Sequence, residues 1–80
     1  MSGHHPPITC KEMKAILKIL GFALQSTNGS HEQWSKVVNG RKYKVTVDCP
    51  KSPFSHTLIE SMAAQAGLTR KEIYRIRNTI

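Results

Sequence analysis

The sequence has few acidic residues, few aromatics and no long hydrophobic run. Five Asp and Glu stand against twelve Lys and Arg, giving a formal net charge of +7 over 80 residues. No apolar stretch approaches the roughly 20 residues needed to span a bilayer. There is also no glycine-rich phosphate loop, no paired-carboxylate pattern and no zinc-type spacing of cysteine and histidine. We therefore expect a soluble protein with no membrane partner, no bound metal and no small-molecule cofactor.

Cysteine is scarce as well. Cys10 and Cys49 are the two cysteines, too few and too far apart for the framework of a disulfide-rich secreted scaffold. We expect both to be reduced thiols. No charged start followed by an apolar stretch opens the chain, so no secretory signal is indicated and a cytoplasmic location is expected.

A chain of 80 residues fits one domain, because small chains bury too little surface to build a second core. The opening segment carries His4-His5 and Pro6-Pro7, a composition typical of a poorly ordered tail. We expect a disordered tail over residues 1–8 and a single domain over residues 9–80. The two histidines of the tail are then incidental rather than metal-binding.

The first half of the domain is predicted to be a helix followed by three strands. Thr9-Cys10-Lys11-Glu12 has the form of a capping box, which predicts a helix from about Cys10 to Leu20. A short alternating segment follows, and then Asn28-Gly29 and Asn39-Gly40 give two tight-turn signals. Strands at about 30–38 and 41–47 complete an antiparallel meander.

The second half is predicted to be helical. Pro50 and Pro53 indicate a loop, after which apolar residues return to helical spacing from Leu58 until Gly67. A second capping box at residues 69–72 predicts a short C-terminal helix. The fold class is therefore α+β, a helix, a three-stranded antiparallel sheet, a helix and a short helix, with both main helices on one side of the sheet.

The positive charge favours a polyanionic partner, with nucleic acid as the leading candidate. The basic residues recur along the chain rather than in one run, which indicates charged faces. A solvated, solubilising surface is the alternative, because charge alone does not identify a ligand.

His31 is the residue most suited to chemistry. It follows the turn at Asn28-Gly29, at the start of a predicted strand, and an imidazole titrates near neutral pH. If Trp34 faces the helices, alternation places His31 on the opposite, accessible face of the sheet. The alternatives are a structural histidine, and an outward Trp34 that stacks on bases.

Basic residues crowd the hairpin after His31 and are candidates to hold phosphates beside it. Protection of an exposed strand edge by lysine is the alternative role. A metal site from His31, Cys49 and His56 is conceivable, but its spacing matches no zinc pattern. The predicted RNA-binding residues are Gly29, Ser30, Lys36, Arg41, Lys42 and Lys44.

From about Thr9 to Tyr74 the chain resembles the HicA family of bacterial toxins. The resemblance rests on the order of four pieces rather than on any single one. They are the helix ending in Leu20-Gly21-Phe22, the Gly29-Ser30-His31 turn, the basic hairpin with Lys44-Val45-Thr46-Val47, and Thr57-Leu58-Ile59 leading to Gln65-Ala66-Gly67-Leu68.

The resemblance implies a fold similar to the double-stranded RNA-binding domain, an endoribonuclease that cleaves mRNA and arrests growth, and neutralisation by a HicB-type antitoxin. It also implies that His31 is the catalytic residue, since it matches the histidine of the family's Gly-Ser-His motif. Two positions depart from the pattern. Glu32 stands where many relatives have a second histidine, and Asp48-Cys49-Pro50 replaces a frequent proline–histidine pair.

The mechanism we expect is metal-independent, with neutral His31 taking a proton from a ribose 2′-hydroxyl so that this oxygen attacks the adjacent phosphate. DNA lacks that hydroxyl and should resist. Two other functions fit the same sequence. One is a noncatalytic RNA-binding module, and the other is a degenerate family member that only binds its antitoxin.

Overall fold

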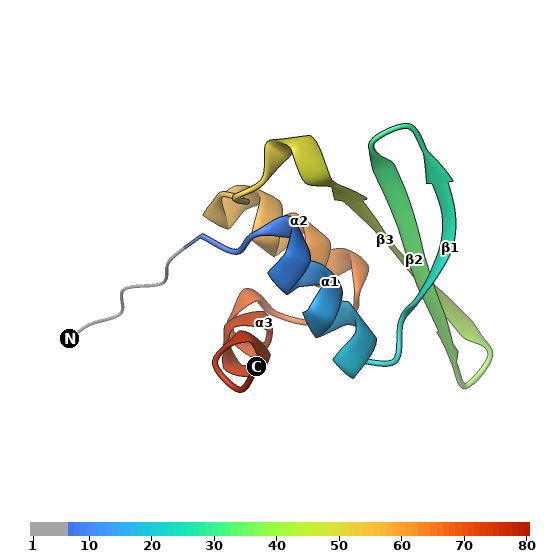
Figure 1. The fold of residues 1–80 in the computed structure, drawn as a ribbon. Coiled ribbons are helices and arrows are strands. Elements are labelled where there is room, and N and C mark those ends of the chain that lie inside the picture. Colours follow the sequence, from blue (N-terminus) through green and yellow to red (C-terminus); the bar gives the residue numbers. More distant parts are fainter. Residues whose placement is uncertain (1–6) are drawn as a thin grey trace.

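The computed structural model describes residues 7–80, which form three α-helices and one three-stranded antiparallel sheet (Figure 1). The α+β class and the order of elements predicted from sequence are confirmed. The elements are α1 (Cys10–Ile19), β1 (Ala23–Asn28), β2 (His31–Val38), β3 (Arg41–Asp48), the 3-10 turn η1 (Cys49–Lys51), α2 (His56–Gln65) and α3 (Arg70–Arg77).

Both predicted capping boxes form. The Thr9 side chain accepts from the backbone N–H of Glu12 at 3.1 Å, and the Glu12 carboxylate accepts from the Thr9 N–H at 2.9 Å. Thr69 and Glu72 repeat this arrangement at the start of α3. The bond from the Thr9 backbone lowers the pKa of the Glu12 carboxyl against the opposing effect of burial, and the positive charge of Arg77 lowers it further.

The sheet is a meander with the order β1-β2-β3. Asn39 and Gly40 have φ of 51° and 80°, the left-handed conformation at both central positions that a tight two-residue hairpin turn requires. This turn sets the β2–β3 register, in which His31 lies opposite Asp48 and Trp34 opposite Val45. Strand β1 pairs with β2 and has a register shift between Leu24 and Ser26.

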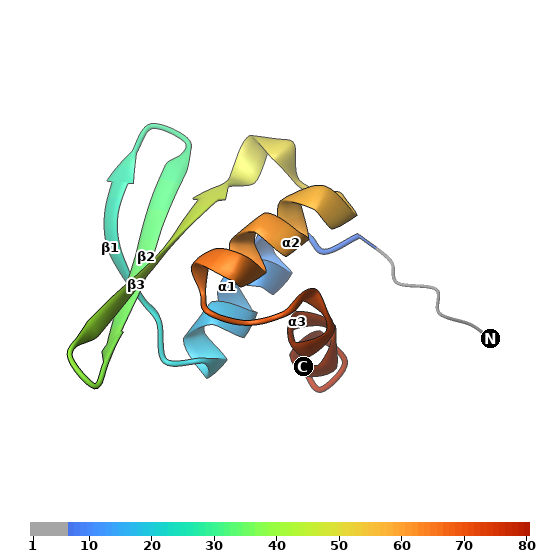
Figure 2. The ribbon, with the colours of Figure 1, turned by 180° about the vertical axis from the view of Figure 1, so that it is seen from behind.

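One face of the sheet packs against the helices, which lie on the same side of it in both ribbon views (Figures 1 and 2). Trp34 is 4% exposed and lies in this core with Val45 and Val47. The inward orientation of Trp34 that we expected from the sequence is confirmed. Because strand residues alternate between faces, His31 and Thr46 lie on the opposite, outer face. The core is completed by residues from all three helices, including Met13, Ile16, Leu17, Ile59, Met62, Ala63, Ile73 and Tyr74.

The expected boundary of the N-terminal tail is wrong at Ile8. Ile8, assigned from sequence to the tail, is fully buried and accepts a hydrogen bond from the Phe54 N–H at 2.8 Å through its carbonyl oxygen. The chain after β3 folds back over this segment and supplies a partner that local sequence does not reveal. Residues 1–6 of the expected tail, with His4 and His5, lie outside the described residues.

The expectation of two free thiols is also wrong, because Cys10 and Cys49 form a disulfide with their Cα atoms 5.2 Å apart. The turn η1 carries Cys49 back to the first residue of α1. The Ser52 hydroxyl accepts from the Cys10 N–H at 2.8 Å at the same place. Proximity in the fold, rather than spacing along the chain, pairs the two residues.

Within residues 7–80, no helix combines the length and the apolar character required to cross a membrane.

Candidate functional site

His31 is the first residue of β2, directly after the two-residue turn Gly29-Ser30. Gly29 has a φ of 64°, which lets the chain reverse between β1 and β2 in so few residues. His31 therefore lies at the end of the sheet, at the rim of its outer face, and 54% of its side chain is exposed. The accessible position predicted for this imidazole is observed.

Asp48 is the partner of His31. The imidazole Nε2 lies 3.3 Å from the Asp48 Oδ2, and the Asp48 side chain is 22% exposed. The two residues face each other because they form a register pair across β2 and β3. When Nε2 carries the proton and donates it to this carboxylate, Nδ1 keeps the lone pair of a neutral imidazole. A histidine oriented in this way can accept a proton from a substrate hydroxyl.

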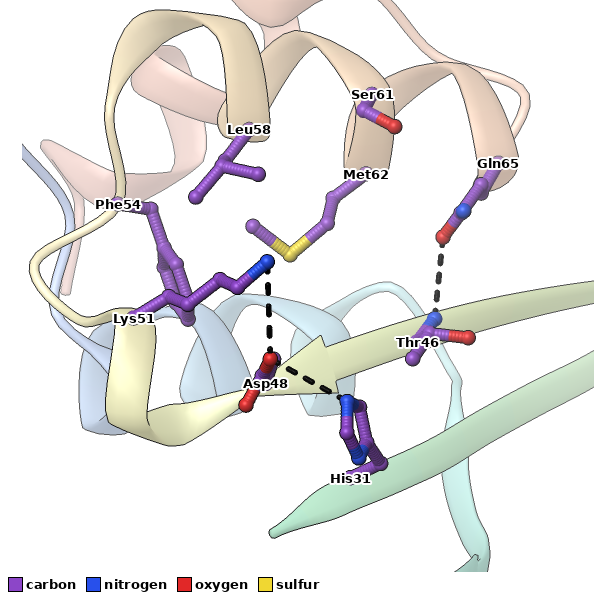
Figure 3. A pocket seen from close by; sticks show the side chains of 9 residues that line it. All are labelled: His31, Thr46, Asp48, Lys51, Phe54, Leu58, Ser61, Met62 and Gln65. Atoms are coloured by element: carbon purple, nitrogen blue, oxygen red, sulfur yellow. Dashed lines mark hydrogen bonds and ion pairs between the residues drawn. The ribbon is translucent and has the colours of Figure 1, made fainter.

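Lys51 adds a cation to the pair. Its Nζ lies 4.0 Å from the same Asp48 oxygen, and 62% of its side chain is exposed. Pro50 is the second residue of turn η1, and its fixed φ and missing N–H suit the first turn of such a segment. The short turn holds Lys51 close to the end of β3. The site thus joins an imidazole, a carboxylate and an exposed ammonium group within one small area (Figure 3).

A pocket of about 230 Å³ opens beside these three groups. Its other wall is formed by α2 and the segment before it, with Phe54, Leu58 and Met62 pointing into the space between the helix and the end of β3 (Figure 3). The pocket exists because α2 runs along the free edge of β3 while the strands end in the His31–Asp48 pair.

Gln65 anchors the last turn of α2 to the strand edge. Its Oε1 accepts from the backbone N–H of Thr46 at 3.1 Å, which satisfies a strand donor that has no neighbouring strand. The Thr46 hydroxyl donates to the Gln33 Oε1 at 3.0 Å on the outer face. These bonds fix the orientation of both side chains at the pocket rim.

Glu32, which follows His31 in sequence, lies outside the site. Its side chain is on the inner face of β2, where one carboxylate oxygen accepts from the Trp34 Nε1 at 3.1 Å. The other lies 3.4 Å from the Lys14 Nζ on α1. Glu32 therefore supports the buried tryptophan and cannot reach the outer face where His31 lies.

The predicted RNA-binding residues are only partly brought together. Gly29 and Ser30 form the turn next to His31. Lys44 and Lys42 are exposed on the same outer face, opposite Ser35 and Val37 of β2. At about 3.3 Å per strand residue they lie roughly 13 and 20 Å from the His31 position along the strand.

Lys36 and Arg41 lie on the other face. The Lys36 Nζ donates to the carbonyl oxygen of Leu20 at 2.9 Å and lies 5.0 Å from the centre of the Phe22 ring. It thus closes the C-terminal end of α1. The Arg41 guanidinium lies 5.1 Å from the centre of the Tyr43 ring. Neither residue is placed beside His31, because alternation along the strands turns both toward the helix side.

His31, Cys49 and His56, the three residues considered as metal ligands, do not form a metal site. In the part of the chain that the structure describes, no three His, Cys, Asp or Glu side chains are grouped as metal ligands. Cys49 is bonded to Cys10, and the His56 ring lies edge-on to the Tyr74 ring with 6.2 Å between centroids.

Sequence reasoning missed Asp48, Lys51 and Gln65. Asp48 could have been predicted as the partner of His31. A two-residue turn at Asn39-Gly40 pairs residues that are equally distant from it in sequence, and His31 and Asp48 are such a pair. Lys51 and Gln65 carry no comparable signal. Their positions depend on how η1 and α2 pack against the strand ends.

Fold and site together define a small basic α+β protein with a histidine–carboxylate pair beside a pocket. Comparison with protein-family models, with curated proteins and with solved structures gave no match to the chain.

Proposed function

We propose that this protein is a metal-independent endoribonuclease with His31 as its catalytic residue. The observation that carries the proposal is the 3.3 Å contact between His31 and Asp48 at an exposed strand end. A carboxylate that orients an imidazole is a recurring device for general-base catalysis. The net charge of +7 favours a polyanionic substrate such as RNA.

In the proposed reaction, Asp48 holds the proton of His31 on Nε2, and Nδ1 takes the proton of a ribose 2′-hydroxyl. The 2′ oxygen then forms a bond to the adjacent phosphorus while the bond from phosphorus to the 5′ oxygen breaks. The departing oxygen takes a proton from water. The products are a 2′,3′-cyclic phosphate and a free 5′-hydroxyl, so a 2′-deoxy nucleotide at the cleaved position blocks the reaction.

The cations supply substrate affinity. Lys51 lies next to the His31–Asp48 pair and is positioned to attract the reacting phosphate. Lys44 and Lys42, farther along the outer face, suit phosphates of neighbouring nucleotides. The substrate strand then runs along the outer face of the sheet, and its reacting phosphate lies at the His31 end, next to α2.

The biological role we propose follows the resemblance to HicA toxins. The helix–sheet–helix order is compatible with a fold like that of the double-stranded RNA-binding domain, and Gly29-Ser30-His31 is the matching motif. On this proposal the protein cleaves mRNA in the cytoplasm, arrests growth as the toxin of a toxin–antitoxin pair, and is neutralised by a HicB-type antitoxin protein.

The test is cleavage of a defined single-stranded RNA by purified wild type and His31→Ala in the presence of EDTA. We expect cleavage by the wild type, loss of cleavage in the variant, and a 2′,3′-cyclic phosphate in the product. A matched control is His56→Ala, because His56 lies on α2 but does not line the pocket. Circular dichroism verifies that all three proteins are folded.

Equal cleavage by wild type and His31→Ala would overturn the catalytic assignment. Tight, salt-sensitive RNA binding without cleavage would instead favour the noncatalytic RNA-binding module. For the toxin role, expression of the wild type should arrest growth and expression of His31→Ala should not. Growth arrest by both proteins would show that toxicity does not depend on His31.

A further inference from the structure

The pocket beside His31 is larger than the proposed proton transfer needs. Its volume is about 230 Å³, and it extends from the imidazole to the last turn of α2. A cavity of about 150 Å³ is enough to hold benzene. The space therefore accommodates one aromatic ring system next to the catalytic group.

The floor of the pocket is apolar. Phe54 and Met62 are 1% and 6% exposed, so they form a fixed surface, and Leu58 continues it toward the opening. The transfer of a flat aromatic ring from water to such a surface is favourable, and the thioether of Met62 can contact the edge of the ring. This floor favours a ligand with a planar, weakly polar face.

The rim of the pocket is polar and oriented. Because the Gln65 Oε1 is held by the Thr46 N–H, the Gln65 amide nitrogen is left as a donor. The Thr46 hydroxyl donates its hydrogen bond to Gln33, and its oxygen lone pairs can accept a hydrogen bond from a ligand. Ser61, exposed on α2, adds a hydroxyl that can donate or accept. A ligand that presents acceptors and donors along one edge of a ring is complementary to this rim.

The mouth of the pocket is charged. His31, Asp48 and Lys51 all line it, and Lys51 is the exposed cation of the three. A nucleotide offers a planar base face, a hydrogen-bonding base edge and, joined through its ribose, a phosphate, and these suit the floor, the rim and the mouth of the pocket.

We propose that this pocket binds the base of the nucleotide that flanks the phosphate cleaved by His31, and that it gives the protein its base preference. The inference rests on the proposed ribonuclease function, because it assigns a substrate subsite to the same centre. It adds that selection among RNA sequences depends on α2, and in particular on Gln65, rather than on the basic hairpin.

The binding test uses nucleotides that cannot be cleaved. The four nucleoside 3′-monophosphates are titrated separately into the ¹⁵N-labelled wild-type protein, with ribose 5-phosphate as the base-free comparison. We expect the preferred nucleotide to bind at least about tenfold more tightly than ribose 5-phosphate, the scale of one base packed on a protein surface. Amide shifts should centre on Thr46, Leu58 and Gln65. Equal affinity of all five compounds would overturn the proposal.

A filling variant and its matched control make the test specific. Ser61→Trp places a large side chain in the pocket from an exposed helix position, whereas Ala64→Trp places the same side chain on exposed α2 outside the pocket. We expect Ser61→Trp to remove the preference for nucleotides over ribose 5-phosphate and Ala64→Trp to retain it. The same result in both variants would contradict the assignment.

Gln65→Glu tests selection. The carboxylate still accepts from the Thr46 N–H but no longer donates at the rim. We expect the ranking of the four nucleotides to change, with a matching change in the sequences cut in RNA. Comparison of nucleotides with one another removes the effect of the added negative charge, because all four carry the same phosphate. An unchanged ranking would exclude Gln65 from base selection and overturn the proposal.

The outcomes distinguish the pocket from the reaction. Selective nucleotide binding together with undiminished cleavage by His31→Ala would reject the catalytic proposal and keep the pocket. Cleavage that depends on His31 together with no base-dependent binding would keep the ribonuclease and reject the pocket.

Discussion

The two faces of β2 perform different tasks. On the outer face, His31 contacts Asp48 at the rim of a pocket. On the inner face, Glu32 and Lys36 hold Trp34 and the end of α1 in place. Residues adjacent in sequence thus belong either to the candidate chemistry or to the stability of the fold.

Residue type alone does not assign a role in this chain. Lys36 and Lys44 are both lysines of the same hairpin, yet one donates to a carbonyl oxygen inside the fold and the other is exposed on the outer face. Alternation along a strand decides between them, because successive side chains point to opposite faces.

The largest expected difference is between His31→Ala and Glu32→Ala. A positioned general base contributes roughly 10²–10⁴-fold to rate, so His31→Ala should lower RNA cleavage by about that factor with little change in stability. Glu32→Ala leaves the Trp34 N–H without its acceptor and should lower the free energy of unfolding by about 1–3 kcal/mol. Cleavage per folded Glu32→Ala molecule should stay unchanged.

Denaturant unfolding and initial cleavage rates, measured on both variants, check this division. A Glu32→Ala protein that is stable but inactive would show that Glu32 takes part in cleavage, and that the two faces of β2 do not differ in role as we propose.

Asp48→Asn should give the next largest effect. An amide can present its N–H₂ group to His31 and favour the wrong tautomer, and it cannot stabilise an imidazolium. We expect kcat to fall at least about tenfold with KM unchanged, since the neighbouring Lys51 is retained. The check is a double-mutant comparison, in which Asp48→Asn adds no further loss in the His31→Ala background. A full additional loss there would show that Asp48 acts independently of His31.

Lys44→Met and Lys36→Met test whether the outer face binds RNA while the inner face stabilises the fold. Lys44→Met should weaken RNA binding and reduce the salt slope by about 0.7 if one phosphate contact of a single strand is lost. Lys36→Met should leave that slope unchanged and lower the free energy of unfolding by about 0.5–1.5 kcal/mol, because its hydrogen bond to Leu20 is lost. Binding titrations at several salt concentrations measure the slopes. Equal slopes for both variants would remove Lys44 from the RNA-binding face.

The smallest expected effect concerns acid stability on the helix side. The folded-state pKa of Glu12 is lowered, chiefly by its bond with the Thr9 backbone, so ionised Glu12 stabilises the fold above its unfolded-state pKa. This stabilisation is lost as the pH falls through the lowered pKa. Glu12→Gln should therefore lower the Tm near neutral pH, and the difference from wild type should shrink on acidification. A difference that is constant with pH would show that the charge of Glu12 contributes nothing.

Local signals in the sequence were sufficient for most of the fold. The capping boxes at Thr9 and Thr69 and the Asn39-Gly40 turn act within a few residues, so their geometry follows from neighbouring side chains and φ preferences. Contacts between distant segments were not accessible in this way. Ile8 against Phe54 and Cys10 against Cys49 are brought together only when the chain after β3 returns to the start of α1.

The candidate site divides along the same line. Motif and alternation were enough to select His31 and to place it on the accessible face, because both depend on residues close in sequence. The partner Asp48 follows from strand register, which requires the hairpin to form. Lys51 and Gln65 reach the site only through the packing of η1 and α2 against the ends of the strands. That packing depends on the shape of the whole core, and it creates the pocket that no short stretch of the chain encodes.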